Sequence, residues 1–232
     1  MNAARSGRPG AHSRAVEDYL KAIFKLQAES LQVSTTALAG QLNRSAASVT
    51  NMVKSLAEQG LVVHEPYRGV HLTPTGEAAA LGIIRRHRVI ETYLIERLGF
   101  TWDGVHAEAE RLEHAASDVL IDRMARALGD PDEDPHGAPI PSSEGVIASR
   151  DLVSLTDMRE GARAVVREVS DEDSGRLREL AAAGFLLGTE VVVKHRLPDG
   201  QLVVRVGGRE RRLDATTAGL IRLELSGIEP SG

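Results

Sequence analysis

The chain of 232 residues contains no cysteine. Disulfides and thiolate metal sites are therefore excluded, which leaves carboxylates and imidazoles as the strong metal ligands. A metal site built from oxygen and nitrogen ligands alone favours the harder divalent ions.

Long apolar segments are also missing. No run of 18 apolar residues occurs, and the polar N-terminal segment MNAARSGRPGAHSR lacks the apolar stretch of a signal peptide. We therefore expect a cytoplasmic protein without a membrane partner. Hydrophobic residues make up 42% of the chain, which is enough for one large domain or two to three small domains with apolar cores.

The chain lacks an excess of positive charge, since 28 Lys/Arg stand against 33 Asp/Glu and the formal net charge is -5. That balance argues weakly against nucleic-acid binding until it is divided by region. Residues 1–72 contain 8 Lys/Arg and 5 Asp/Glu, whereas residues 73–145 contain 7 and 14. A basic first third and an acidic middle predict different partners for the two regions.

The first third has the pattern of a winged helix-turn-helix. Apolar residues recur at helical spacing from Ala15 to about Glu29. Ser34 and Ser45 are predicted N-caps of a second and a third helix, which are separated by a polar turn, and Gly60 ends the third. Two short β-type runs in LVVHEPYRGVHL then predict a hairpin wing. Three helices with this wing are typical of a DNA-binding domain.

Polar side chains on the third helix are predicted to bind double-stranded DNA. A polar helix face alone is usually only solvated, but the preceding helix, the short turn and the wing place this one where a recognition helix enters the major groove. The amide of Asn51 can pair bidentately with adenine, whereas Arg44, Lys54 and Arg68 suit phosphate contacts. The predicted DNA-binding residues are Arg44, Ser45, Ser48, Thr50, Asn51, Lys54, Tyr67 and Arg68.

The middle third is predicted to be helical. One helix begins at Thr73–Pro74 and ends at about Leu98, and another covers roughly Val105 to Leu128. The segment GDPDEDPHGAPIPSSEG that follows is rich in proline, glycine and acid, so we expect a linker or extended loop.

The last third changes to alternating and β-branched runs. These are ARAVVREVS, TEVVVKHR, QLVVRVG and LIRLELS, and Pro198-Asp199-Gly200 marks a hairpin turn. They predict a small antiparallel barrel or sandwich of about five strands.

Six potential metal ligands occur on the two predicted helices of the middle third. On a helix Glu110, Glu113 and His114 share one face, and two like charges one turn apart repel by a few tenths of a kcal/mol. An arginine, a lysine or a metal ion should offset that repulsion. Taken singly these side chains are more often ion-paired or structural, so a structural role and a metal site both remain open. The six are His87, Glu91, His106, Glu110, Glu113 and His114.

The sequence resembles the diphtheria toxin repressor family of metal-dependent transcriptional regulators, especially its manganese-responsive, manganese transport regulator-like members. The motifs EDYLKAIFKL, YRGVHLTPTGE, RRHRVIE and VHAEAERLEH occur in order over nearly the whole chain. The resemblance implies a mainly α fold with a small β domain. It implies a winged helix-turn-helix in residues 1–73, a helical dimerisation and metal-binding domain in 74–145, and an SH3-like β-barrel in 146–232.

The resemblance also implies two metal sites. Iron-type members carry methionine where this chain has Asp18 and cysteine where it has Glu110, and carboxylates suit Mn²⁺ better in relative terms. The shorter manganese regulators carry a glutamate where this chain has Lys21, so two separated sites fit better than a bridged pair. A ligand from DEDSGR in the last domain is also expected, and we select Asp173. The implied primary site consists of Asp18, Glu110, Glu113 and His114, and the ancillary site of His87, Glu91 and His106.

We therefore predict a homodimeric, manganese-dependent repressor of metal homeostasis genes that binds operator DNA and is not an enzyme. An iron- or zinc-responsive repressor of the same family is the main alternative, because affinity for divalent ions generally rises from Mn²⁺ towards Zn²⁺. A metallohydrolase is a weaker alternative, since the chain has no HExxH pattern. A winged-helix regulator that senses an organic ligand is the third.

Overall fold

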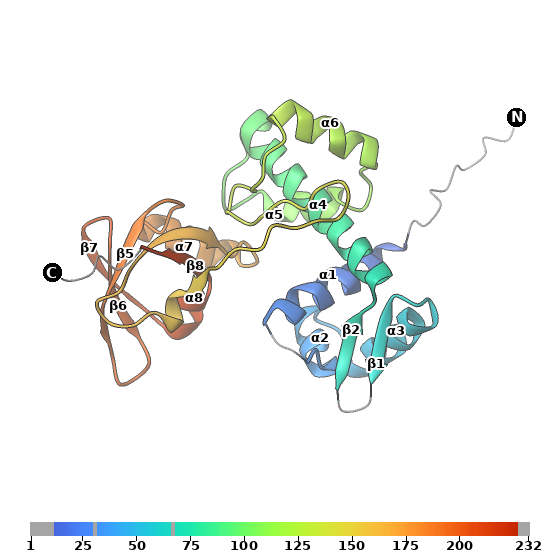
Figure 1. Cartoon of the computed structure of the whole chain (residues 1–232), viewed down its shortest axis with the longest axis horizontal. Coiled ribbons are helices and arrows are strands. Elements are labelled where there is room, and N and C mark those ends of the chain that lie inside the picture. Colours follow the sequence, from blue (N-terminus) through green and yellow to red (C-terminus); the bar gives the residue numbers. More distant parts are fainter. Residues whose placement is uncertain (1–11, 30–31, 66–67, 227–232) are drawn as a thin grey trace, which may run out of the picture. The chain divides into compact units, whose positions relative to one another are not determined.

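The computed structural model describes residues 12–29, 32–65 and 68–226 (Figure 1). The chain forms two compact units, which are described separately. The first contains the described residues up to Arg86 together with Pro141–Val146, and the second contains His87–Ile140 and the described residues from Ile147. Within the described part of the chain, every helix is too short or too polar to cross a membrane.

The first unit is a winged helix-turn-helix, as the sequence predicts. Its helices are α1 (Arg14–Glu29), α2 (Thr35–Gln41) and α3 (Ala46–Glu58), and its wing pairs β1 (Val62–Glu65) with β2 (Gly69–Leu72) in antiparallel register. Both predicted caps are present, because Ser34 Oγ accepts from Ala37 N at 3.0 Å and Ser45 Oγ accepts from Ser48 N at 3.3 Å. The buried core includes Leu20, Ile23, Leu38, Val49, Val53 and Leu56.

The wing packs closely against the start of α4 (Pro74–Leu98). A Cβ on Gly76 would lie 1.9 Å from the carbonyl oxygen of Leu61, so no other residue fits there without a shift of the backbone. Thr73, directly before α4, holds the turn that precedes β1, since its Oγ1 donates to Gly60 O at 2.7 Å.

The helices of the second unit differ from the prediction in one place. The single helix expected from Val105 to Leu128 is divided into α5 (His106–Leu112) and α6 (Asp118–Leu128). Ser117 causes the break, because its Oγ accepts from Leu120 N at 3.2 Å and caps α6. Val89, Ile90, Leu94, Ala109 and Ile121 form the buried core of these helices.

The β region of the second unit is a single six-stranded antiparallel sheet in the order β3-β8-β4-β5-β6-β7. The predicted barrel is therefore corrected to an open sheet, because the two edge strands β3 and β7 do not pair among the described residues. The strands are β3 (Val153–Ser154), β4 (Arg163–Val169), β5 (Glu190–Arg196), β6 (Leu202–Val206), β7 (Arg209–Leu213) and β8 (Ile221–Leu225). The short helices are η1 (Leu155–Asp157), α7 (Ser174–Ala183) and α8 (Ala215–Gly219).

Part of the segment predicted as a linker is folded against the sheet. Glu133 and Pro139 form an isolated bridge, and Val169 N on β4 donates to His136 O at 3.0 Å. A Cβ on Gly137, whose φ is +90°, would lie 1.9 Å from Arg167 O. The loop between α6 and β3 is thus anchored to β4 by backbone contacts.

Candidate metal centre and nucleic-acid interface

Four side chains of the second unit converge on one point. His87 and Glu91 lie one turn apart on α4, His106 begins α5, and Asp171 follows β4. Each offers one ligand atom, and the four atoms lie within 4.8 Å of one another. His87 Nε2 lies 3.0 Å from Glu91 Oε1, and His106 Nδ1 lies 2.9 Å from Asp171 Oδ2. The structure therefore brings together the three residues predicted for the ancillary site and adds a fourth.

Asp171, and not Asp173, is the acid beside the histidines. Asp173 Oδ1 accepts from Gly175 N at 2.9 Å and from Arg176 N at 3.0 Å, so this side chain caps α7. Our choice of Asp173 is corrected for that reason. The N-cap preference of an aspartate directly before a helix could have assigned this role from the sequence.

Neighbouring carboxylates raise the pKa of both histidines. Burial lowers the pKa of His87, but hydrogen bonds to Asp171, Glu113 and Glu91 outweigh it and raise that pKa well above 6.5. Burial also lowers the pKa of His106, but hydrogen bonds to Asp171 and Glu91 outweigh it and raise that pKa to about 9. Burial raises the pKa of Glu91, yet hydrogen bonds from His106 and His87 bring it below 4.5. A metal ion that binds here must displace the histidine protons.

A second group of possible ligands lies at the other oxygen of Glu91. Glu91 Oε2 is 3.9 Å from His136 Nδ1, and Asp134 completes the group. Both named atoms are buried and have no hydrogen-bond partner among the described residues. Burial raises the pKa of Asp134 to about 6, although the charge of Arg88 lowers it. The sequence reasoning missed Asp134 and His136 because their segment looked like a linker.

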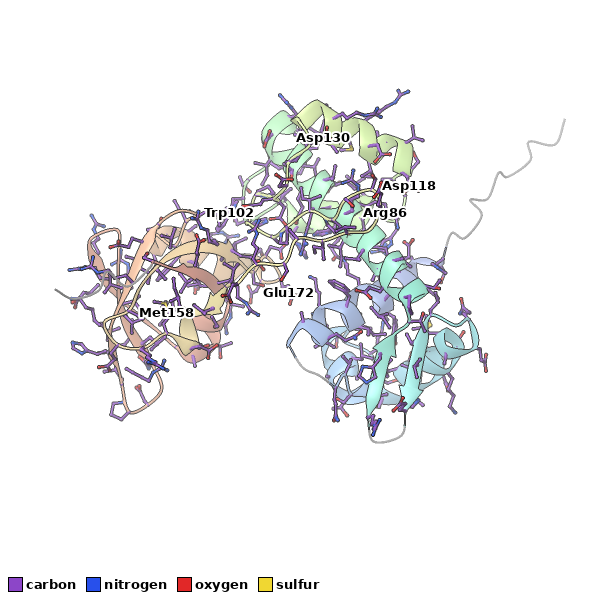
Figure 2. All side chains as sticks on the ribbon, in the orientation of Figure 1. Arg86, Trp102, Asp118, Asp130, Met158 and Glu172 are labelled. Atoms are coloured by element: carbon purple, nitrogen blue, oxygen red, sulfur yellow. The ribbon has the colours of Figure 1, made fainter. Side chains whose placement is uncertain are left out.

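The imidazole of His136 is oriented by a backbone carbonyl. Its Nε2 donates to Trp102 O at 2.8 Å, and this contact turns Nδ1 towards Glu91 Oε2. This is the arrangement of most metal-ligating histidines, whose other ring nitrogen donates to a carbonyl or carboxylate. The ring centroid of Trp102, labelled in Figure 2, lies 5.1 Å from that of His136 at a tilt of 35°, and Trp102 packs against the core of the sheet. These contacts orient Nδ1 of His136 and Oε2 of Glu91 so that both could bind one cation.

The residues predicted for the primary site lie in both units. Glu113 caps the end of α5 and is buried, with Oε1 3.3 Å from His114 Nε2. Because α5 ends at Leu112, Glu113 and His114 lie in a turn rather than on a helical face. Glu110 Oε1 is 3.7 Å from His106 Nε2. Asp18 lies on α1 of the first unit, so its participation stays a prediction.

His87 contacts both groups of predicted ligands. Its Nε2 faces Glu91, while its Nδ1 donates to Glu113 Oε2 at 2.6 Å. One imidazole therefore connects the ancillary cluster to a residue of the predicted primary site.

The exposed face of α3 carries most of the predicted DNA-binding side chains. Val49, Val53 and Leu56 are buried on the opposite face. Thr50 is half-buried and its Oγ1 donates to Ala46 O at 2.9 Å, which leaves it less available for a base. Arg44, Ser45, Ser48, Asn51, Lys54 and, on the wing, Arg68 are exposed. Tyr67 lies outside the described residues.

Three family profiles match the chain in sequence order. Residues 12–70 match "Iron dependent repressor, N-terminal DNA binding domain", and residues 73–142 match "Iron dependent repressor, metal binding and dimerisation domain". Residues 153–225 match "FeoA domain".

Relatives and solved structures resemble the chain over most of its length. The diphtheria toxin repressor of Corynebacterium diphtheriae is 30% identical over 218 residues, which cover 90% of this chain and 96% of that protein. The iron-dependent repressor IdeR of Mycobacterium tuberculosis is 30% identical over 84% of this chain and 89% of its own. A manganese-dependent transcriptional repressor in complex with manganese is 38% identical, with a TM-score of 0.86 over 91% of this chain and 100% of that structure. ScaR with bound Zn²⁺ is 28% identical, with a TM-score of 0.81 over 90% and 98%.

Proposed function

The chain belongs to the iron-dependent repressor family, and from that membership we propose that it is a manganese-responsive repressor which binds operator DNA as a homodimer. The family consists of metal-dependent, DNA-binding transcriptional repressors, which are not enzymes. The metallohydrolase and the sensor of an organic ligand are therefore set aside. We also propose the division into domains at residues 1–73, 74–145 and 146–232.

The donor chemistry supports manganese as the effector. Every candidate ligand is a carboxylate or an imidazole, and the chain has no cysteine to provide a soft thiolate. Iron and zinc remain alternatives, since two relatives are named as iron-dependent or diphtheria toxin repressors and a structural neighbour holds Zn²⁺. DNA affinity should be titrated with Mn²⁺, Fe²⁺ and Zn²⁺ at buffered free concentrations. Activation by Mn²⁺ in the range of its cellular concentration supports the proposal, and activation by Fe²⁺ or Zn²⁺ alone contradicts it.

We propose Asp18, Glu110, Glu113 and His114 as the ligands of the primary site. A divalent ion bound there would offset the repulsion between the clustered glutamates. Because Asp18 lies on α1, next to the helices that read DNA, such a site would link metal binding to the DNA-binding domain. By linkage, DNA must then strengthen metal binding by the same factor by which metal strengthens DNA binding.

We propose that the ancillary site has two adjacent ligand positions that share Glu91. One uses Glu91 Oε1 with His87, His106 and Asp171, and the other uses Glu91 Oε2 with Asp134 and His136. The unpartnered buried atoms of Glu91 and His136 support the second position. Buried polar atoms of this kind cost about 1–3 kcal/mol each unless a ligand or water satisfies them.

His87 is proposed to couple the ancillary and primary sites. Its hydrogen bond to Glu113 fixes both the imidazole and the carboxylate, as outer-shell partners of metal ligands usually do. His87→Ala should therefore weaken metal binding at both sites, whereas His136→Ala, whose imidazole faces Glu91 and Trp102 O, should weaken only the ancillary one. Calorimetric titration with Mn²⁺ distinguishes the two variants. Equal effects of both variants on the primary site would contradict the coupling.

Exposed apolar side chains on α6 are proposed to contribute to the dimer interface. Val119 and Leu120 are adjacent and are 64% and 49% exposed, in a region that matches a dimerisation domain. Val119→Asp should weaken the dimer in sedimentation equilibrium. Val146→Asp is the matched control, since Val146 is 65% exposed but lies outside the region of that profile match. Dimers of equal strength in both variants would place the interface elsewhere.

A further inference from the structure

Arg88 on α4 contacts both ends of the turn that residues 134–139 form. Its Nε lies 3.4 Å from Asp134 Oδ2, and its Nη1 donates to Pro139 O. The ion pair is largely buried, since 18% of the Arg88 side chain and 3% of the Asp134 side chain are exposed. A guanidinium carries several donors in one plane, so a single arginine can hold both acceptors at once. Arg88 therefore attaches both ends of the turn to α4.

The turn itself is held in one shape by its own hydrogen bonds. Asp134 Oδ1 accepts from His136 N at 2.8 Å and from Ala138 N at 3.0 Å. Asp134 N donates to Ala138 O at 2.9 Å, and Gly137 N donates to Asp134 O at 3.0 Å. Contacts made at the two ends of this turn therefore also fix His136, which lies in its middle.

Three other donors hold the turn, and none of these three lies on α4. Val169 N on β4 and Arg150 Nη1, in the segment before β3, donate to carbonyl oxygens of the turn at 3.0 and 2.8 Å. Trp102 Nε1, in the connection between α4 and α5, does so at 2.9 Å. Glu91 lies on α4, three residues after Arg88. Arg88 thus ties the turn directly to the helix that carries Glu91.

Glu91 and His136 face each other without bonding. Glu91 Oε2 lies 3.9 Å from His136 Nδ1, which exceeds the limit of about 3.2 Å for a hydrogen bond. Both atoms are buried and have no hydrogen-bond partner among the described residues. Because the two atoms do not hold each other, their alignment depends on contacts made elsewhere between the turn and α4.

We propose that Arg88 is a positioning residue of the ancillary site, which holds the turn of residues 134–139 on α4 so that His136 and Glu91 can bind one divalent cation. This inference rests on the proposed function, because it assigns a role at the ancillary site. Arg88 acts through Asp134 and Pro139 and is not itself a ligand. Buried ion pairs add little net stability but can select one geometry, so the main effect of Arg88 is expected on metal affinity.

The charge of Arg88 alone would have the opposite effect. A guanidinium beside the proposed ligands repels a divalent cation, so a purely electrostatic role predicts that removing the charge strengthens metal binding. A positioning role predicts that the same change weakens metal binding, because His136 is no longer held opposite Glu91. The sign of the change in affinity therefore separates the two roles.

Calorimetric titration of the full-length, metal-free protein with Mn²⁺ measures that sign. Arg88→Met keeps a long side chain without the charge, and it should weaken binding at the ancillary site by about tenfold, the lower end of the range for outer-shell partners. Arg88→Lys keeps the charge, but its single ammonium cannot hold both acceptors as the planar guanidinium does, so we expect a smaller loss. Wild-type or stronger binding by Arg88→Met overturns the proposal.

Trp102 provides a second readout that needs no metal. It is the single tryptophan of the chain, its Nε1 donates to Pro135 O, and its ring lies 5.1 Å from that of His136. Quenching of its fluorescence by acrylamide should increase in metal-free Arg88→Met, because the turn is held less firmly. An unchanged Trp102 signal in that variant overturns the proposal.

Arg97→Met is the matched control. It removes the same charge from the same helix, together with a hydrogen bond from Arg97 Nη2 to Ala127 O. The control should keep the wild-type Mn²⁺ affinity and the wild-type Trp102 signal, and equal changes in both variants overturn the proposal. Circular dichroism checks that the variants fold. If Arg88→Met does not fold, Arg88→Lys decides, and wild-type affinity in Arg88→Lys then overturns the proposal.

Glu91→Gln separates a failure of this inference from a failure of the proposed function. If Glu91→Gln titrates with Mn²⁺, Fe²⁺ and Zn²⁺ as the wild-type protein does, the ancillary site itself fails and Arg88 has no ligands to position. If Glu91→Gln loses metal binding but Arg88→Met keeps the wild-type affinity, only the role of Arg88 fails.

Discussion

The exposed face of α3 and the cluster around Glu91 are both polar, yet their side chains differ in solvent exposure and in the contacts they make. Asn51 and Lys54 are exposed and make no side-chain hydrogen bond or ion pair among the described residues. Glu91 is fully buried and faces histidines from α4 and α5. A DNA duplex is a large ligand with a defined shape, so solvated side chains can bind it. A single ion requires ligands that already converge, and their mutual contacts hold them in place until it binds.

The largest effect should come from replacing the carboxylate that the buried cluster shares. Glu91→Gln keeps the size of the side chain but removes the charge that faces His87 and His106. We expect Mn²⁺ affinity at the ancillary positions to fall by more than about 100-fold, since even outer-shell partners are worth about 10–100-fold. Calorimetric titration measures the loss. Glu96→Gln, an exposed change on the same helix, is the control, and equal behaviour of the two variants would refute the cluster as a metal site.

Metal affinity at the cluster should increase with pH, unlike contacts made by the uncharged amide of Asn51. The pKa of His106 is about 9 in the metal-free protein, so at neutral pH a bound ion displaces its proton. Raising the pH removes that proton beforehand, which strengthens binding by about tenfold per pH unit per displaced proton until pH approaches 9. Titrations in buffers of different ionisation enthalpy count the protons released. A pH-independent affinity between about pH 6.5, the ordinary pKa of histidine, and about pH 8.5, just below the pKa of His106, would contradict this account.

On the exposed face, single substitutions should change DNA binding without changing the fold. Asn51→Ala should reduce discrimination between operator and random DNA by about 1–3 kcal/mol, because it removes a base contact. Lys54→Ala should instead weaken binding to both DNAs. Fluorescence anisotropy with the two duplexes measures both effects, and equal losses for Asn51→Ala on the two DNAs would exclude it as a base-reading residue.

The smallest effect concerns the local stability of the recognition helix. Ser45→Ala removes the oxygen that accepts from Ser48 N, so the free energy of unfolding should fall by about 1 kcal/mol. Ser48→Ala, an exposed change whose side chain caps no helix, should change stability by less than about 0.5 kcal/mol. Chemical denaturation of the metal-free protein compares the two. Equal stabilities of the two variants would mean that the Ser45 side chain does not stabilise α3 by capping it.

The elements that depend on local sequence could be predicted. Ser34 and Ser45 cap their helices as expected, and the wing lies where its two β-type runs predict it. The misses have physical causes. Ser117 caps α6 and so interrupts a run whose apolar spacing is helical throughout. The strand β7 is a charged edge strand in which only Leu213 is buried, so it lacks the alternation that predicts a strand.

The metal centre could be predicted only in part. His87 and Glu91 lie one helical turn apart, as do His106 and Glu110, which indicated possible ligands, and the family resemblance grouped His87, Glu91 and His106 as one site. Asp134 and Asp171 lie in loops and come to the same place through packing that no local pattern records. The chemistry of the site was therefore predictable from its helices, while its full ligand set depends on the fold of the second unit.

DNA affinity of Glu113→Gln with and without Mn²⁺ tests the central claim most directly, that metal binding at the proposed primary site controls DNA binding. The substitution keeps the size of Glu113 but removes the charge that a divalent cation needs. We expect the variant to keep its fold without metal and to lose the Mn²⁺-dependent increase in operator affinity that the wild-type protein shows. A wild-type metal response in this variant would contradict the account.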